Sequence, residues 1–161
     1  DIEGSVRFNV PTDAPDRIKD IFLGEQHRSD LPSNFIVKRR DGLIAYQLAT
    51  AIDDLDEGYT HVIRGADLLE SSLRQMMLHQ TLGRLSPEYG HLPIVTDQSG
   101  NKLSKQNGAQ AIDKDTPNAN LRRALAFLGQ PTPPQDVDCV EDILQLATVN
   151  WRRNALNSKN L

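Results

Sequence analysis

The stretch THVIRG at residues 60–65 decides the fold class that the sequence predicts. Its apolar centre stops at Gly65, a pattern that predicts a short buried strand. Residues 43–55 before it carry apolar side chains at spacings of three and four, which is typical of one helix face. A second helix is expected at residues 72–82 and a strand-like piece at residues 91–95. Strands mixed with helices in this way predict an α/β fold.

Two further strands are expected nearer the beginning of the chain. Residues 5–10 alternate polar and apolar side chains and then meet a proline-rich break, as a strand does when it enters a turn. Residues 35–37 form a short apolar run that a charged turn follows. Residues 18–22 show no period that assigns them to a helix or a strand.

The helix expected at residues 72–82 has a recognisable start and end. Ser72 and Gln75 have the spacing of a capping box, in which the serine hydroxyl accepts a backbone N–H and the glutamine side chain reaches back. Gly83 is expected to end the helix, and a loop through Asp67 and Glu70 is expected before it.

Helical signals alone occupy residues 116–161. Thr116-Pro117 predicts a helix that begins with a capping hydroxyl and a proline in its first turn. Asp138 and Glu141 are expected to cap a last helix, whose apolar positions repeat at helical spacing. We therefore expect an α/β unit over residues 1–115 and a small helical appendage over residues 116–161.

Composition describes an ordinary globular protein. The chain has 161 residues, and 18 Lys and Arg against 22 Asp and Glu give a formal net charge of −4, which excludes a uniformly basic nucleic-acid coat. Hydrophobic residues make up 38%, and no apolar run approaches the roughly 20 residues that span a bilayer, so no membrane segment is expected. The single cysteine, Cys139, excludes an internal disulfide and fits a reducing cytoplasm. The four histidines lack metal-ligand spacing, so no metal site is assigned. The abrupt start at Asp1 suggests a fragment.

The polar loop over residues 97–108 is the most informative stretch for chemistry. Lys102 and Lys105 lie three residues apart among small polar residues and glycines. Such a loop can bring two ammonium charges onto a triphosphate, where they stabilise the negative charge that grows during nucleotidyl transfer. The alternative is a solvated polar loop, which is common on protein surfaces.

Two further side chains are candidates for binding a small polar ligand. Arg64 ends an apolar strand, where its guanidinium can hold a carboxylate; the alternative is a structural ion pair with Asp67 or Glu70. Tyr46 begins a helix and can place its hydroxyl against a ligand; the alternative is a half-buried packing residue. The basic clusters at residues 38–40, 122–123 and 152–153 are the pattern expected where RNA phosphates touch one side, or else solvated faces.

Taken together, these segments are specific enough to suggest a family. Residues 34–49, the pair Asp53-Asp54, and residues 61–68 resemble the second half of the catalytic domain of class I glutamyl-tRNA synthetases. KLSK at residues 102–105 is similar to the KMSKS motif of that family. Within it, RGADLL at residues 64–69 and the closing NWRR resemble the truncated paralogues, the glutamyl-Q tRNA(Asp) synthetases.

The resemblance implies a fold, a reaction and a set of site residues. The fold would be the second half of a Rossmann-like class I catalytic domain. Tyr46 and Arg64 would bind the glutamate substrate. Lys102, Leu103, Ser104 and Lys105 would contact ATP, with Lys102 and Lys105 as the catalytic pair. The family uses ATP and Mg²⁺ to form glutamyl-adenylate, and the paralogues transfer glutamate to queuosine in the anticodon of tRNA(Asp). Thr50 stands where full-length relatives often carry asparagine, so it is given no role.

The resemblance also implies what this chain would lack. The HIGH-type signature, the first nucleotide-binding half and the zinc site of the paralogues are expected upstream of Asp1. We therefore expect the 161 residues alone not to activate glutamate. A cytoplasmic monomer is expected. Two alternatives stay open, namely a fragment of an ordinary glutamyl-tRNA synthetase and an RNA-binding module that has lost the chemistry.

Overall fold

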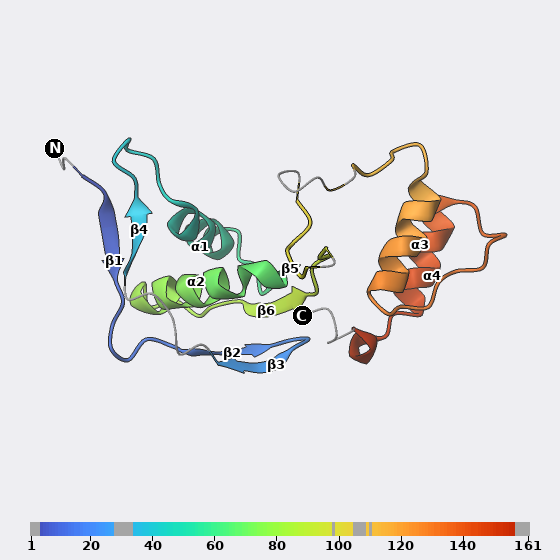
Figure 1. Ribbon diagram of the computed structural model, residues 1–161. Helices are drawn as coiled ribbons and strands as arrows, with labels where there is room; N and C mark the ends of the chain where they lie inside the picture. The colour runs from blue at the N-terminus through green and yellow to red at the C-terminus, as the bar shows by residue number, and fades with distance from the viewer. Residues whose placement is uncertain (1–3, 28–33, 98, 105–108, 110, 157–161) are drawn as a thin grey trace. The chain divides into compact units, whose positions relative to one another are not determined.

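The computed structural model describes residues 4–27, 34–97, 99–104, 109 and 111–156 (Figure 1). Contacts divide the chain into two compact units, residues 1–91 and 92–161, and each is described by itself. The division at His91 falls earlier than the boundary at residue 115 expected from the sequence. The expected boundary was placed where strands mixed with helices give way to helices alone, which is a different criterion from contacts between residues. It stays a prediction.

The described part of the first unit contains three two-stranded sheets. They pair β1 (Val6–Asn9) with β4 (Asn34–Lys38), β2 (Arg17–Asp20) with β3 (Gly24–His27), and β5 (His61–Gly65) with β6 (Glu88–Leu92). The first two pairs are antiparallel. The strands expected at residues 5–10, 35–37 and 60–65 are confirmed, whereas the β2–β3 hairpin carried no sequence signal.

Two helices complete the first unit. α1 (Tyr46–Asp56) packs against α2 (Leu69–Thr81), and the short 3-10 helix η1 (Ala66–Leu68) leads into α2. The backbone N–H of Glu88 at the start of β6 donates to the carbonyl of Thr60, just before β5, at 2.9 Å. Both strands therefore start at one edge and run in the same direction, with α2 as the crossover of a βαβ unit.

The hydrophobic core of this unit forms two clusters, and α2 contributes side chains to both. One consists of Phe35, Val37, Ala51, Met77 and Leu78, and the other of Ile18, Leu73 and Tyr89. Alternation along β4 buries Phe35 and Val37, as the period of a half-buried strand requires. β5 is less buried than predicted, since Ile63 is 48% exposed. Among the described residues this strand pairs with β6, so one of its edges stays open.

The second unit contains a helical pair, which confirms the helices expected there. α3 (Pro117–Phe127) packs on α4 (Val140–Val149) around Leu125, Ile143 and Ala147, and the 3-10 helix η3 (Arg153–Ala155) follows. Arg122 donates from Nη2 to the carbonyls of Pro134 and Val137 at 2.6 and 2.7 Å. Its charge is therefore used to hold the connection between the helices.

The side-chain hydrogen bonds predicted to cap the three helix starts are not formed, whereas Gly83, at a φ of +66°, follows the end of α2 and Pro117 opens α3, both as predicted. α2 begins at Leu69 rather than Ser72, so the expected loop through Asp67 and Glu70 is η1 and the first turn of α2. The Thr116 hydroxyl donates to Asp113 instead of capping α3. α4 begins after Cys139 without a side-chain cap. α2 and α4 begin at positions other than those predicted, so the expected side chains do not face the free N–H groups; Thr116 does precede α3 as predicted, but its hydroxyl bonds to Asp113.

Candidate active site

Arg64 lies near the end of β5 and connects that strand to α2. Its Nη2 atom donates to Ser72 Oγ at 2.6 Å and to Gln75 Oε1 at 2.7 Å. The guanidinium carbon lies 4.9 Å from the centroid of the Tyr89 ring on β6. The side chain is thus held by hydrogen bonds on one side and by an aromatic face on another, within the reach of a cation–π contact.

One alternative expected for Arg64 was an ion pair with Glu70, and this alternative is wrong. The Glu70 carboxylate accepts from Arg74 Nη2 at 2.5 Å, one helical turn further along α2. The two hydrogen bonds of Arg64 described above are made to neutral groups. Its positive charge is therefore not neutralised by these partners.

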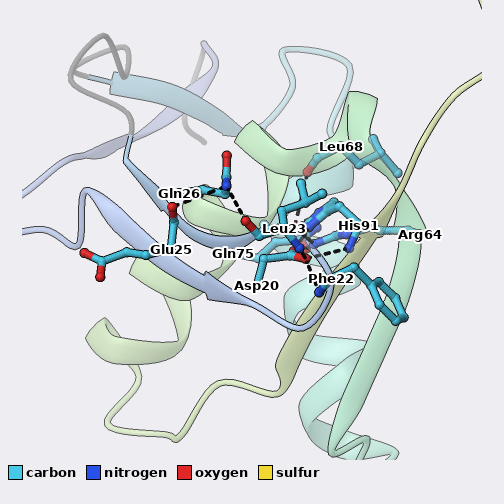
Figure 2. A network of polar contacts seen from close by, with 10 residues as sticks. Asp20, Phe22, Leu23, Glu25, Gln26, Arg64, Leu68, Gln75 and His91 are labelled. Atoms are coloured by element: carbon cyan, nitrogen blue, oxygen red, sulfur yellow. Dashed lines mark hydrogen bonds and ion pairs between the residues drawn. The ribbon is translucent and has the colours of Figure 1, made fainter. Parts of the chain in front are cut away.

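A buried polar chain lies behind Arg64, and Figure 2 shows it from close by. His91 Nδ1 lies 2.5 Å from Asp20 Oδ2, and His91 Nε2 lies 2.8 Å from Ser72 Oγ. The side chains of Asp20 and His91 are both fully buried. Ser72 therefore contacts the imidazole on one side and the Arg64 guanidinium on the other.

Asp20 is anchored as a carboxylate. Its Oδ1 atom accepts the backbone N–H groups of Phe22, Leu23 and His91 at 2.8, 2.9 and 3.2 Å. Burial alone would raise the pKa of Asp20, but the hydrogen bonds from His91 and from these backbone groups outweigh it and lower the pKa below 3.8. The bonds from Phe22 and Leu23 also close the turn between β2 and β3.

Several polar atoms around Arg64 are buried and make no hydrogen bond within the part of the chain that the structure describes. They are Arg64 Nε, Gln75 Nε2 and the Tyr89 hydroxyl. Burial raises the pKa of Tyr89 to about 12, so this hydroxyl stays protonated. Unpartnered donors in a buried place are costly and mark a site where a ligand oxygen would be stabilised.

Tyr46 is the first residue of α1 and is 51% exposed. Arg64 lowers the pKa of Tyr89, whereas Asp54 and, once ionised, the Tyr46 phenol raise it, so these side chains lie in one region. The structure therefore brings the two predicted glutamate-binding residues, Tyr46 and Arg64, to the surroundings of one tyrosine. Their roles in binding stay predictions.

The predicted ATP-binding loop belongs to the second unit. Asp97 accepts the backbone N–H groups of Ser99 and Asn101, both at 2.9 Å, and Thr96 forms an isolated bridge with Lys102. Gly100 takes a φ of +81°, which only glycine adopts without strain. The described part of the loop is thus an ordered turn. Lys102 and Leu103 are exposed and Ser104 is partly buried. Lys105 lies outside the described residues.

Sequence reasoning missed most of the side chains that surround Arg64. Ser72 and Gln75 carried a signal, but their spacing suggested a capping box. Tyr89, His91 and Asp20 carried none, because their partners are distant in the sequence. Among the described residues, no group of three His, Cys, Asp or Glu side chains could hold a metal ion. None of the described helices is long and apolar enough to cross a bilayer.

Comparison with known proteins identifies the family. Residues 1–154 match the tRNA synthetases class I (E and Q), catalytic domain. The chain belongs to this family of ligases, and the predicted α/β fold of a class I catalytic domain is confirmed.

The relatives narrow the resemblance further. The chain is 48% identical over 145 residues to a glutamyl-Q tRNA(Asp) synthetase of Vibrio parahaemolyticus, covering 86% of this chain and 49% of the relative. It is 47% identical over 128 residues to the protein of that name in Methylococcus capsulatus, covering 79% and 42%. The predicted resemblance to glutamyl-Q tRNA(Asp) synthetases is thereby confirmed. The chain spans about half the length of these relatives or less.

Solved structures agree on the fold. A glutamate-tRNA synthetase from Elizabethkingia anophelis superposes with a TM-score of 0.68 at 24% identity, over 95% of this chain and 35% of that one. A glutamate tRNA ligase from Elizabethkingia meningosepticum gives a TM-score of 0.65 at 25% identity, over 95% and 34%.

Proposed function

We propose that the complete protein uses ATP to convert glutamate to glutamyl-adenylate and then transfers the glutamyl group to queuosine in the anticodon of tRNA(Asp). Membership of the class I family and the names of the similar proteins support this proposal. The observation that carries it is Arg64, a guanidinium held in place by neutral side chains beside unpartnered donors. Because the chain spans about half the length of its relatives, we infer that it carries part of the active site.

Arg64 suits the recognition of a carboxylate. The bonds to Ser72 and Gln75 orient the guanidinium before the ligand arrives, so little rotational freedom is lost on binding. A carboxylate of glutamate would supply the negative charge that these partners do not. Tyr46, half-exposed at the start of α1, would add a hydroxyl contact to the same amino acid.

Lys102 and Lys105 would act on the phosphates. In the activation step a carboxylate oxygen of glutamate attacks the α-phosphorus of ATP, the bond to the bridging oxygen breaks, and pyrophosphate leaves. ATP enters as its magnesium complex, in which the cation offsets part of the phosphate charge. The lysine ammonium groups would stabilise the charge that grows on the leaving pyrophosphate, and Leu103 and Ser104 would shape the loop around it.

Transfer to RNA requires a basic surface as well. Lys38 ends β4, Arg39 and Arg40 follow it, and all three are exposed; Arg39 is partly neutralised by Asp41 at 2.6 Å. Arg152 and Arg153 are exposed in the second unit. We propose that such clusters meet the phosphates of the tRNA(Asp) anticodon region, and that the protein acts as a monomer in the cytoplasm.

The test uses the complete gene product. Glutamate-dependent exchange between ATP and pyrophosphate is measured first without tRNA and then with it. Labelled glutamate is then offered to tRNA(Asp) with queuosine, to tRNA(Asp) without it, and to tRNA(Glu). We expect transfer to queuosine-containing tRNA(Asp) alone. Transfer that is independent of queuosine, or that charges tRNA(Glu), would refute the proposal and favour an ordinary glutamyl-tRNA synthetase. The 161-residue chain by itself is expected to show no exchange.

A further inference from the structure

We propose that Asp20 and His91 are positioning residues for substrate binding, because they fix the orientation of Ser72 and, through it, of Arg64. This inference rests on the proposed function, since it takes the Arg64 guanidinium as the group that binds a carboxylate of glutamate.

The contacts form one continuous chain from the β2–β3 hairpin to the site. Asp20 contacts His91 at 2.5 Å (Figure 2). His91 contacts Ser72 at 2.8 Å, and Ser72 accepts from Arg64 at 2.6 Å. β6 contributes both His91 and, two residues earlier, Tyr89, whose ring lies under the guanidinium. The strand therefore supports Arg64 from two directions.

Asp20, His91 and Ser72 contact one another in the order of a hydrolytic triad, but these three residues cannot work as one. Ser72 and His91 are 0% exposed, and Asp20 is 4% exposed. A substrate carbonyl therefore has no access to Ser72 Oγ, which already accepts from Arg64. We therefore assign these three groups a structural role, in which each fixes the orientation of the next.

The hydrogen bonds between Asp20, His91, Ser72 and Arg64 have constrained donor and acceptor roles. Asp20 receives three backbone N–H groups on Oδ1, so its carboxylate cannot turn, and Oδ2 can only accept from His91 Nδ1. The hydroxyl hydrogen of Ser72 has two acceptors: His91 Nε2 when that nitrogen carries no proton, or the Leu68 carbonyl at 3.2 Å when Nε2–H donates to Ser72 Oγ. In both arrangements its hydrogen points away from Arg64 and a lone pair faces the guanidinium.

Asp20→Asn tests these roles at almost unchanged volume. The asparagine removes the negative charge and can present its amide donor to His91 Nδ1, which moves the imidazole proton to Nε2, so that Ser72 Oγ has to accept from His91 as well as from Arg64. The exposed pair Asp16 and His27, 2.7 Å apart beside the same hairpin, provides the matched control Asp16→Asn.

Both variants are made in the complete gene product, and KM and kcat are measured for glutamate and for ATP in pyrophosphate exchange, with glutamate affinity by calorimetry. We expect Asp20→Asn to raise the glutamate KM and Kd about tenfold, as the weakening of one charge-assisted contact would, with the ATP KM unchanged. Asp16→Asn should change neither.

The outcomes separate this inference from the proposed function. A wild-type protein without glutamate-dependent exchange refutes both. An active wild type in which Asp20→Asn lowers kcat alone, or lowers only the temperature of unfolding, refutes the positioning role and leaves the proposed function standing. If Asp20→Asn does not fold by circular dichroism, Ser72→Ala decides by the same criterion, because it removes the acceptor that faces Arg64.

Discussion

Replacing Arg64 with alanine is expected to weaken glutamate binding by about tenfold to over a hundredfold. The side chain donates to Ser72 and Gln75 and lies over Tyr89, so its position does not depend on the ligand. A charge-assisted hydrogen bond contributes about 1.5–3 kcal/mol, and each 1.4 kcal/mol is about a factor of ten in affinity. Truncation also leaves the oxygens of Ser72 and Gln75 without their donor.

The measurement is the glutamate KM in ATP–pyrophosphate exchange by the complete gene product, together with the ATP KM. Arg64→Lys separates charge from shape, because an ammonium group lacks the planar fork of donors with which the guanidinium binds its partners. We expect this variant to recover only part of the loss. Arg17→Ala, which removes an exposed arginine paired with Glu25 at 3.0 Å, is the control and should change neither constant. An unchanged glutamate KM and rate in Arg64→Ala would remove Arg64 from the site.

Three further predictions concern other parts of the chain. Lys105→Ala should slow adenylate formation far more than it weakens glutamate binding, because its charge acts in the transition state; an equal loss in both would indicate a folding defect. Burial lowers the pKa of His79 in the folded chain below 6.5. Below this pH the unfolded chain therefore binds a proton more readily than the folded chain does, and the free energy of unfolding should fall as the pH drops. His79→Gln should flatten this dependence in denaturant unfolding between about pH 7 and 5, and an unaltered slope would contradict it. Ile143→Ala, at a fully buried position, should destabilise the α3–α4 pair by about 2–5 kcal/mol, whereas Leu144→Ala, 48% exposed, should cost far less; similar costs would show that α4 does not pack as described.

Local patterns predicted the elements whose signals lie within a few residues. The alternation at residues 5–10 and the helical spacing at residues 43–55 are confirmed as β1 and α1. Side chains two or four positions apart share one face of a strand or helix, so burial of that face is visible in the sequence. The β2–β3 hairpin was not predicted, because its turn is closed by Asp20, a residue that alternation does not mark.

The capping box shows where local reasoning fails. Ser72 and Gln75 have the correct spacing, but α2 begins at Leu69, and both side chains turn to Arg64 instead. The same i, i+3 relation that would serve a cap also places two acceptors on one helix face. Only the position of β5 beside that face decides between the two.

The sequence by itself determined the class of the protein, because the segments around Tyr46, Arg64 and the KLSK loop are each continuous in the sequence. The residue types and spacings that characterise the family can therefore be recognised within each segment. The tertiary structure decided how Arg64 is held. Asp20 and His91 are 71 residues apart in the sequence and 2.5 Å apart in space. A contact of this kind leaves no period or spacing in the sequence, because it arises when the β2–β3 hairpin packs against β6 and both side chains are removed from water. Once buried, each of them needs the hydrogen bond that the other supplies.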